Sequence, residues 1–122
     1  MADALFDTNI LIDYLLGIEA ARETIERYSV PVISIVTWME VLVGAVDEEE
    51  ETAIHPFLDR FERIDISGAI ALRAVRLRRA QHIRLPDAII WATAQEVGCP
   101  LISRDTKAFP RGAGGIIVPY RR

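Results

Sequence analysis

Short apolar runs alternate with longer helical patterns along the whole chain, and this alternation constrains the fold more than any other feature of the sequence. Five of these runs are apolar enough to be buried strands. They are Ala4–Phe6, Val32–Ser34, Ile64–Ile66, Leu101–Ser103 and Ile116–Val118. Strands that alternate with helices predict an α/β fold, with a mostly parallel sheet covered by helices on both faces.

The segments between the runs carry the apolar spacing of helices. The predicted helices lie roughly at Asn9–Leu16, Glu19–Tyr28, Ile35–Ala45, Glu48–Phe61, Ala69–Gln81 and Asp87–Val97. Gly17 and Gly98 follow two of them, as C-terminal capping glycines do. Ser67 is placed to cap one helix, and Pro86 is placed in the first turn of another. These signals indicate where the helices begin and end.

The size and composition of the chain indicate one globular domain that spans residues 1–122. Hydrophobic residues make up 51% and charged residues 26%, as in folded domains. The single cysteine, Cys99, excludes a disulfide within the chain and a thiolate metal cluster. The N-terminus lacks the basic segment of a signal peptide, and no apolar run has the roughly 18 to 20 residues of a membrane span. We therefore expect a cytoplasmic protein without a membrane partner.

The net charge of −4 argues mildly against a nucleic-acid partner, because proteins that bind phosphate are usually basic. The acidic side includes Glu48–Glu51, which suits the solvated first turn of a helix. The basic side is almost all arginine, with Lys107 the only lysine. Arginine is the better bidentate ligand for phosphate, but a compositional bias of the genome gives the same pattern. Net charge therefore decides little.

Three aspartates follow predicted strands or open a predicted helix. Asp7 follows the first strand, Asp105 follows the strand Leu101–Ser103, and Asp87 opens the helix that ends at Val97. Taken singly, each is explained as a turn or capping residue. Ligands of open α/β sheets, however, bind beyond the carboxyl ends of the strands. The three acids are thus expected at one rim of the sheet.

Glu40 is the only charge in the apolar segment Ile35–Val43. One interpretation places it, with Thr37, Gly44 and Asp47, on the narrow exposed stripe of a mostly buried helix. The helix also begins directly after the second strand, which puts Glu40 within about two turns of the same rim.

Four carboxylates in one cleft repel each other and resist desolvation. Hard divalent cations such as Mg²⁺ or Mn²⁺ take oxygen ligands of this kind and offset the repulsion. The chemistry indicated is metal-assisted hydrolysis, in which the ion activates water and stabilises charge on a phosphoryl oxygen. Nucleophile-elbow, Walker and dinucleotide-binding motifs are all missing from the sequence, and His55 and His82 are interpreted as surface groups.

Four segments, in the same order, resemble those of the PIN-domain family, and within it the VapC-type toxins of toxin–antitoxin pairs. Leu5–Asp13 resembles the opening strand with its D-T-N signature, and Ser34–Gly44 resembles the helix that carries the family's glutamate. Leu85–Ala94 resembles the helix of the third acid, and Pro100–Phe109 resembles the segment of the last acid. The resemblance spans nearly the whole chain.

The resemblance implies roles for individual residues. The positions that hold Mg²⁺ or Mn²⁺ in the family match Asp7, Glu40, Asp87 and Asp105. Thr8 and Ser103 match hydroxyl positions that support the acids or the attacking water, and Asn9 matches a polar position beside the site. Asp105 stands at the position that varies most in the family. Asp13 is often acidic in relatives, and we interpret it as structural.

The implied reaction is endonucleolytic cleavage of RNA by a metal-activated water, on a parallel five-stranded sheet with flanking helices. The implied partners are a small antitoxin that inserts a segment near the acidic groove, and a second copy of the chain. Trp38 and Met39 would suit a homodimer surface, or they belong to the core. A positive rim that admits RNA is expected from Arg73, Arg76, Arg78, Arg79 and Arg84, unless these are only a solvated helix face.

Three other functions stay open on the sequence. The first is a PIN nuclease with a housekeeping role, which the absence of a neighbouring antitoxin reading frame would indicate. The second is a non-catalytic PIN-like domain that binds RNA or protein, although such a domain is expected to have a degenerate acid set. The third is a receiver-like or phosphatase-like α/β domain phosphorylated on Asp7, which lacks a suitably placed lysine because Lys107 lies in a predicted loop.

Overall fold

The computed structural model describes residues 3–110 and 112–122, and their strands form one parallel sheet in the order β3-β2-β1-β4-β5. The strands are β1 (Ala4–Phe6), β2 (Pro31–Ser34), β3 (Glu62–Ile64), β4 (Leu101–Ile102) and β5 (Ile116–Ile117). The central strand is β1, where Leu5 is in register with Val32 of β2 and with Leu101 of β4. The predicted parallel five-stranded sheet is confirmed.

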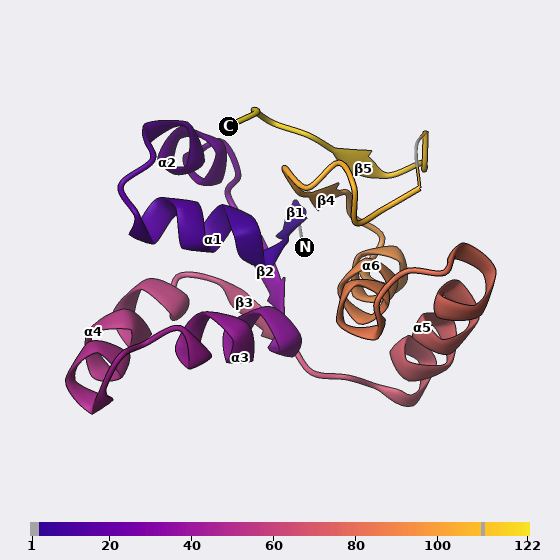
Figure 1. The fold of residues 1–122 in the computed structure, drawn as a ribbon, viewed down its shortest axis with the longest axis horizontal. Helices are drawn as coiled ribbons and strands as arrows, with labels where there is room; N and C mark the ends of the chain where they lie inside the picture. The colour runs from indigo at the N-terminus through magenta and orange to yellow at the C-terminus, as the bar shows by residue number, and fades with distance from the viewer. Residues whose placement is uncertain (1–2, 111) are drawn as a thin grey trace.

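Helices cover both faces of this sheet, as predicted (Figure 1). They are α1 (Thr8–Leu15), α2 (Glu19–Glu26), α3 (Ile35–Val43), α4 (Glu48–Leu58), α5 (Gly68–Gln81) and α6 (Leu85–Val97). Side chains alternate across β1, so Phe6 packs beneath α1 to α4 and Leu5 packs beneath α5 and α6. Both residues are fully buried, which explains why the strands are continuous apolar runs.

Local sequence signals begin and end the helices. Side-chain oxygens cap the N-termini of α1, α3, α4 and α5, and they come from Asp7, Ser34, Asp47 and Ser67. Gly98 ends α6 with a positive φ of 82°, where a side chain would be strained. Within the described ranges, no helix has the length and apolar character that crossing a membrane requires.

Several predicted bounds differ from the structure: α2, α3 and α4 end two or three residues earlier than predicted, the third strand is displaced and the last helix begins earlier. The third strand is Glu62–Ile64 rather than Ile64–Ile66, because it is an edge strand that pairs only with β2 and ends where Ile64 meets Ser34. Ile66 lies beyond it and is 42% exposed. Helix α6 begins at Leu85, ahead of Asp87, because Pro86 fits its first turn.

Candidate active site at the carboxyl edge of the sheet

The carboxyl ends of β1, β2 and β4 meet at one edge, where ligands of open α/β sheets bind. Asp7 directly follows β1, and Ser103 directly follows β4. The backbone N–H of Asp7 donates to the carbonyl of Ile102 at 2.9 Å, which keeps these two strand ends in register. Helix α3 begins directly after β2 and carries Glu40.

Asp7 is buried, with 4% of its surface exposed, and neighbouring donors fix its carboxylate. Its Oδ1 accepts from the backbone N–H of Thr8 at 2.8 Å. Its Oδ2 accepts from the hydroxyl of Ser103 at 2.8 Å and from the side-chain amide of Asn9 at 3.3 Å. That amide also donates to Ser103 Oγ at 3.2 Å. Outer hydrogen bonds of this kind orient the carboxylates that hold metal ions in proteins.

Thr8 joins the N-terminus of α1 to the middle of α3. Its hydroxyl donates to Oε1 of Glu40 at 2.7 Å and lies 3.0 Å from the hydroxyl of Thr37. Thr37 is fully buried, so the interpretation that placed it on an exposed stripe is wrong, whereas Glu40 is exposed. The exposed carboxylate of Glu40 is therefore held at the edge by a hydroxyl group of the D-T-N segment.

Asp87 and Asp105 line a cavity of about 380 Å³ together with Arg84 and Lys107. Asp87 lies in the first turn of α6 and is partly exposed. Asp105 lies in the exposed turn after β4, where its backbone N–H donates to Ser103 Oγ at 3.1 Å. Its Oδ1 accepts from the backbone N–H of Lys107 at 2.9 Å. One oxygen of Asp105 thus stabilises the turn.

The site raises the pKa of its most buried acid. Burial is the largest cause, and it raises the pKa of Asp7 from 3.8 to about 6. Hydrogen bonds from Ser103 and Thr8 oppose this rise by stabilising the anion. The charges of Asp87 and Glu40 add to it. Ionised Asp7 is therefore an energetic cost to the folded protein that a bound cation would offset.

The other acids also act on one another. Burial raises the pKa of Asp87, Arg84 opposes this effect, and the charges of Glu40 and Asp105 reinforce it. Electrostatic repulsion thus couples Asp87 directly to each of the other three predicted acids. The structure brings all four acids to the same edge of the sheet.

The donor set fits a hard divalent cation that keeps part of its water shell. Across residues 3–110 and 112–122, no three His, Cys, Asp or Glu side chains are placed to enclose an ion by themselves. Ions such as Mg²⁺ commonly bind through one or two carboxylates and retain several waters. A fixed, buried carboxylate that resists ionisation, beside further acids, meets that requirement.

The buried carboxyl of Asp7 makes the stability of the metal-free protein depend on pH. The pKa of Asp7 is about 6 in the folded protein and near 3.8 in the unfolded chain. The contribution of protonated Asp7 to the free energy of unfolding is therefore complete below pH 3.8 and is lost as pH rises through 6. The shift corresponds to about 3 kcal/mol. In chelator, urea unfolding should show Asp7→Asn gaining stability relative to wild type between about pH 4 and about pH 7. A constant difference over that range would contradict the burial of this carboxyl.

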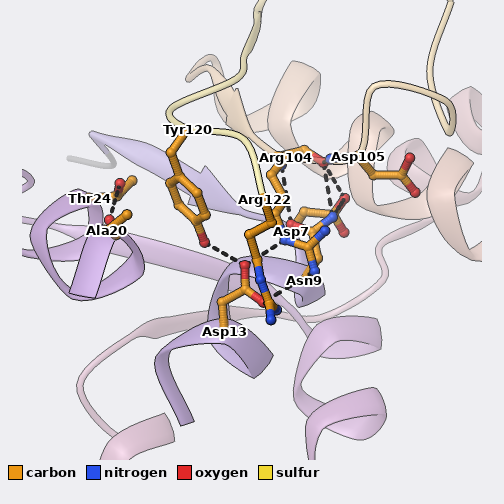
Figure 2. A network of polar contacts seen from close by, with 10 residues as sticks. Asp7, Asn9, Asp13, Ala20, Thr24, Arg104, Asp105, Tyr120 and Arg122 are labelled. Carbon is orange, nitrogen blue, oxygen red and sulfur yellow. Dashed lines mark hydrogen bonds and ion pairs between the residues drawn. The ribbon is translucent and has the colours of Figure 1, made fainter. Parts of the chain in front are cut away.

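The sequence missed a second polar cluster, centred on Asp13 of α1 (Figure 2). Asp13 is fully buried, and Arg104 donates to both of its carboxylate oxygens, at 2.5 Å and 3.1 Å. Tyr120 and Arg122 donate to the same carboxylate at 2.7 Å each. A buried carboxylate needs such partners. An acid beside apolar Ile12, on a helix expected to be largely buried, was therefore a signal that positively charged side chains lie close to it. Nothing in the sequence says which cations these are.

The predicted arginine rim is only partly present. Arg84 lies beside the acids, but Arg73 pairs with Glu96 at 2.5 Å and with Gln95 at 3.1 Å. These contacts span a groove of about 510 Å³ between α5 and α6, which Arg76 also lines. The expectation that Arg73 belongs to the rim is therefore wrong, because its charge is engaged by α6.

Comparisons with known proteins agree with this geometry. The PIN domain family model matches residues 4–115. The chain is similar to a toxin–antitoxin complex from Klebsiella pneumoniae, with 45% identity and a TM-score of 0.92, covering 98% of this chain and 100% of that chain. Its fold resembles DNA-bound VapBC from Salmonella typhimurium, with 24% identity, a TM-score of 0.80 and coverage of 95% and 96%. It also resembles promoter-bound VapBC2 from Rickettsia felis, with 21% identity, a TM-score of 0.74 and coverage of 88% and 90%. The comparison with curated proteins finds no match.

Proposed function

The chain belongs to the PIN-domain family, and from this premise we propose that it is a metal-dependent endoribonuclease, the cytoplasmic toxin of a VapBC-type toxin–antitoxin pair. One observation carries the proposal. Four acids meet at the carboxyl edge of the sheet, where burial and the neighbouring acids make the ionised form of the most buried one costly and a cation would offset that cost. The acids are Asp7, Glu40, Asp87 and Asp105.

We assign Asp7 and Asp87 as the main ligands of Mg²⁺ or Mn²⁺, with Asp105 and Glu40 completing the shell directly or through water. The ion, when bound, activates a water molecule and stabilises charge on the phosphoryl oxygen. Ser103 supports this by orienting Oδ2 of Asp7. Thr8 fixes Oε1 of Glu40, so Oε2 is the atom that we assign to accept a proton from the attacking water.

RNA must approach a negatively charged edge, and two cations support its entry. Arg84 and Lys107 line the cavity that Asp87 and Asp105 share. Positive charges there would contact the phosphates on either side of the scissile bond and offset the repulsion between acids and RNA. We therefore place the RNA backbone along this cavity rather than along the groove of Arg73 and Arg76.

The protein partners that we propose are a small cognate antitoxin and a second copy of the chain. The antitoxin follows from the similarity to a toxin–antitoxin complex over the full length of that chain. For the homodimer, the exposed apolar side chains Met39, Val43 and Val46 offer a surface, at 45%, 83% and 82% exposure. We leave Trp38 out of this surface, because it packs against the core beneath α1 to α4 and the Arg63 guanidinium lies 4.9 Å from the centre of its ring.

The proposal is tested by incubating the purified chain, freed from antitoxin, with a pool of structured RNAs and with DNA of the same sequences. With Mn²⁺ or Mg²⁺ the RNA should be cut internally and the DNA left intact. Chelator should stop the cleavage, and excess Mn²⁺ should restore it. If every RNA stays intact with either metal, the nuclease proposal fails and a non-catalytic binding role replaces it.

A further inference from the structure

We propose that Tyr120 and Arg122, which lie outside the acidic edge, are positioning residues for the nuclease site. Together with Asp13 and Arg104 they form a cluster that we call the clasp. The clasp ties the C-terminal segment to α1 and, through Arg104, to the segment that follows β4 (Figure 2). This inference rests on the proposed nuclease function.

The first link of the clasp is a single buried carboxylate that receives four donor contacts. Oδ1 of Asp13 accepts from Arg122 Nη1 at 2.7 Å and from Arg104 Nη2 at 3.1 Å. Oδ2 accepts from the Tyr120 hydroxyl at 2.7 Å and from Arg104 Nε at 2.5 Å. Two of these four contacts come from the C-terminal segment. Charged hydrogen bonds in a buried setting fix both the rotamer of Asp13 and the position of its partners.

The second link runs from the clasp to the acid that holds the metal. The backbone N–H of Arg104 donates to Oδ1 of Asn9 at 3.3 Å. The amide of Asn9 donates in turn to Oδ2 of Asp7 at 3.3 Å. Arg104 also lies between Ser103 and Asp105 in the chain, so fixing its side chain restrains both neighbours. A displacement of Arg104 would therefore reach the carboxylate of Asp7 through one intervening side chain.

The segment after β4 needs this external restraint. Strand β4 contains only Leu101 and Ile102, and the chain then enters an exposed turn at Asp105. Tyr120, by contrast, packs against the core cluster beneath α1 and gives the clasp a rigid base. Without the C-terminal donors, Asp13 would lose two of its four contacts and hold Arg104 less firmly. We therefore expect weaker orientation of Asp7 without loss of the fold.

The direct test is the double variant Tyr120→Phe with Arg122→Gln, assayed below its melting temperature. We expect the rate at saturating RNA to fall by about tenfold, and the Mn²⁺ concentration for half-maximal rate to rise, as when outer-sphere partners of a metal site are lost. Replacing Arg122→Gln by Arg122→Lys in the double variant keeps a charged donor and should recover part of the lost rate. Arg27→Gln is the matched control, since it removes the same charge from an exposed arginine at the end of α2.

A second readout does not depend on activity. Amide hydrogen exchange in the peptide that covers residues 103–108 should be faster in the double variant than in wild type or Arg27→Gln. The proposal is overturned if the variant melts earlier but keeps the wild-type rate, Mn²⁺ dependence and exchange. It is equally overturned if Arg27→Gln loses as much activity, because charge alone would then explain the effect. If wild type cuts no RNA, the nuclease function fails, and Mn²⁺ binding and exchange still decide the role of the clasp.

Discussion

Asp7→Asn is expected to lower the rate of metal-dependent RNA cleavage by about 100-fold or more. The amide keeps the size of the carboxylate and one acceptor oxygen, but it removes the negative charge that holds the cation. Within the site, the amide nitrogen cannot accept the hydrogen bonds that Oδ2 of Asp7 receives from Ser103 and Asn9, but removal of the buried charge offsets that loss. The variant should therefore fold normally and be inactive.

The measurement is the initial rate of cleavage with Mn²⁺, for wild type and for single acid variants. Asp87→Asn is expected to lose nearly as much as Asp7→Asn, whereas Asp105→Asn should lose less because one oxygen of Asp105 serves its turn. Asp65→Asn is the matched control, since Asp65 is an exposed acid that pairs with Arg63. Equal rates for wild type, Asp7→Asn and Asp65→Asn would show that the edge is not the active site.

Asp13→Ala is expected to lower the free energy of unfolding by about 3 kcal/mol, the low end of the range for breaking a buried ion pair. The substitution leaves Arg104 and Arg122 without their shared anion. The side chains of Arg104 and Arg122 are 29% and 41% exposed, so water can solvate them in the variant. The loss of stability therefore stays near the low end of the range. The hydroxyl of Tyr120 also loses its acceptor.

Urea unfolding of wild type, Asp13→Ala and the control Asp65→Ala measures this loss, and the control should change by no more than about 0.5 kcal/mol. Burial alone would raise the pKa of Asp13, but hydrogen bonds from Arg104, Tyr120 and Arg122 outweigh it and hold the pKa below its ordinary value. Its stabilising effect is therefore present above its unfolded pKa and lost as pH falls. A near-zero change in Asp13→Ala at neutral pH would contradict the assigned network.

The order of strands and helices could be predicted from the sequence because local signals agree with the tertiary structure. Apolar runs mark buried strands. Ser67 caps the N-terminus of α5 with its hydroxyl group, and Gly98 ends α6 by adopting a left-handed backbone conformation. The predicted bounds of an element were wrong where pairing with a distant strand determines them. The edge strand β3 follows its partner β2, and the apolar side chains of Ile64 and Ile66 alone placed it too late.

The candidate site was partly predictable for the same reason. Acids that directly follow strands, such as Asp7, reach the carboxyl edge in any parallel sheet. Contacts between distant segments could not be derived, because periodicity says which residues are buried but not which buried groups meet. Thr37 against Thr8 and Tyr120 against Asp13 are of this kind. The pairing of Arg73 with Glu96 likewise depends on how α5 packs against α6.

The central claim is that the acids at the sheet edge bind a divalent cation, and Mn²⁺ binding tests it most directly. Electron paramagnetic resonance of free Mn²⁺, titrated against protein in the absence of RNA, measures the bound fraction without knowledge of the target. Wild type and Asp65→Asn should deplete the free-ion signal equally, and Asp7→Asn should bind at least about tenfold more weakly. Equal Mn²⁺ binding by all three proteins would contradict the claim, since the ion would then be held elsewhere.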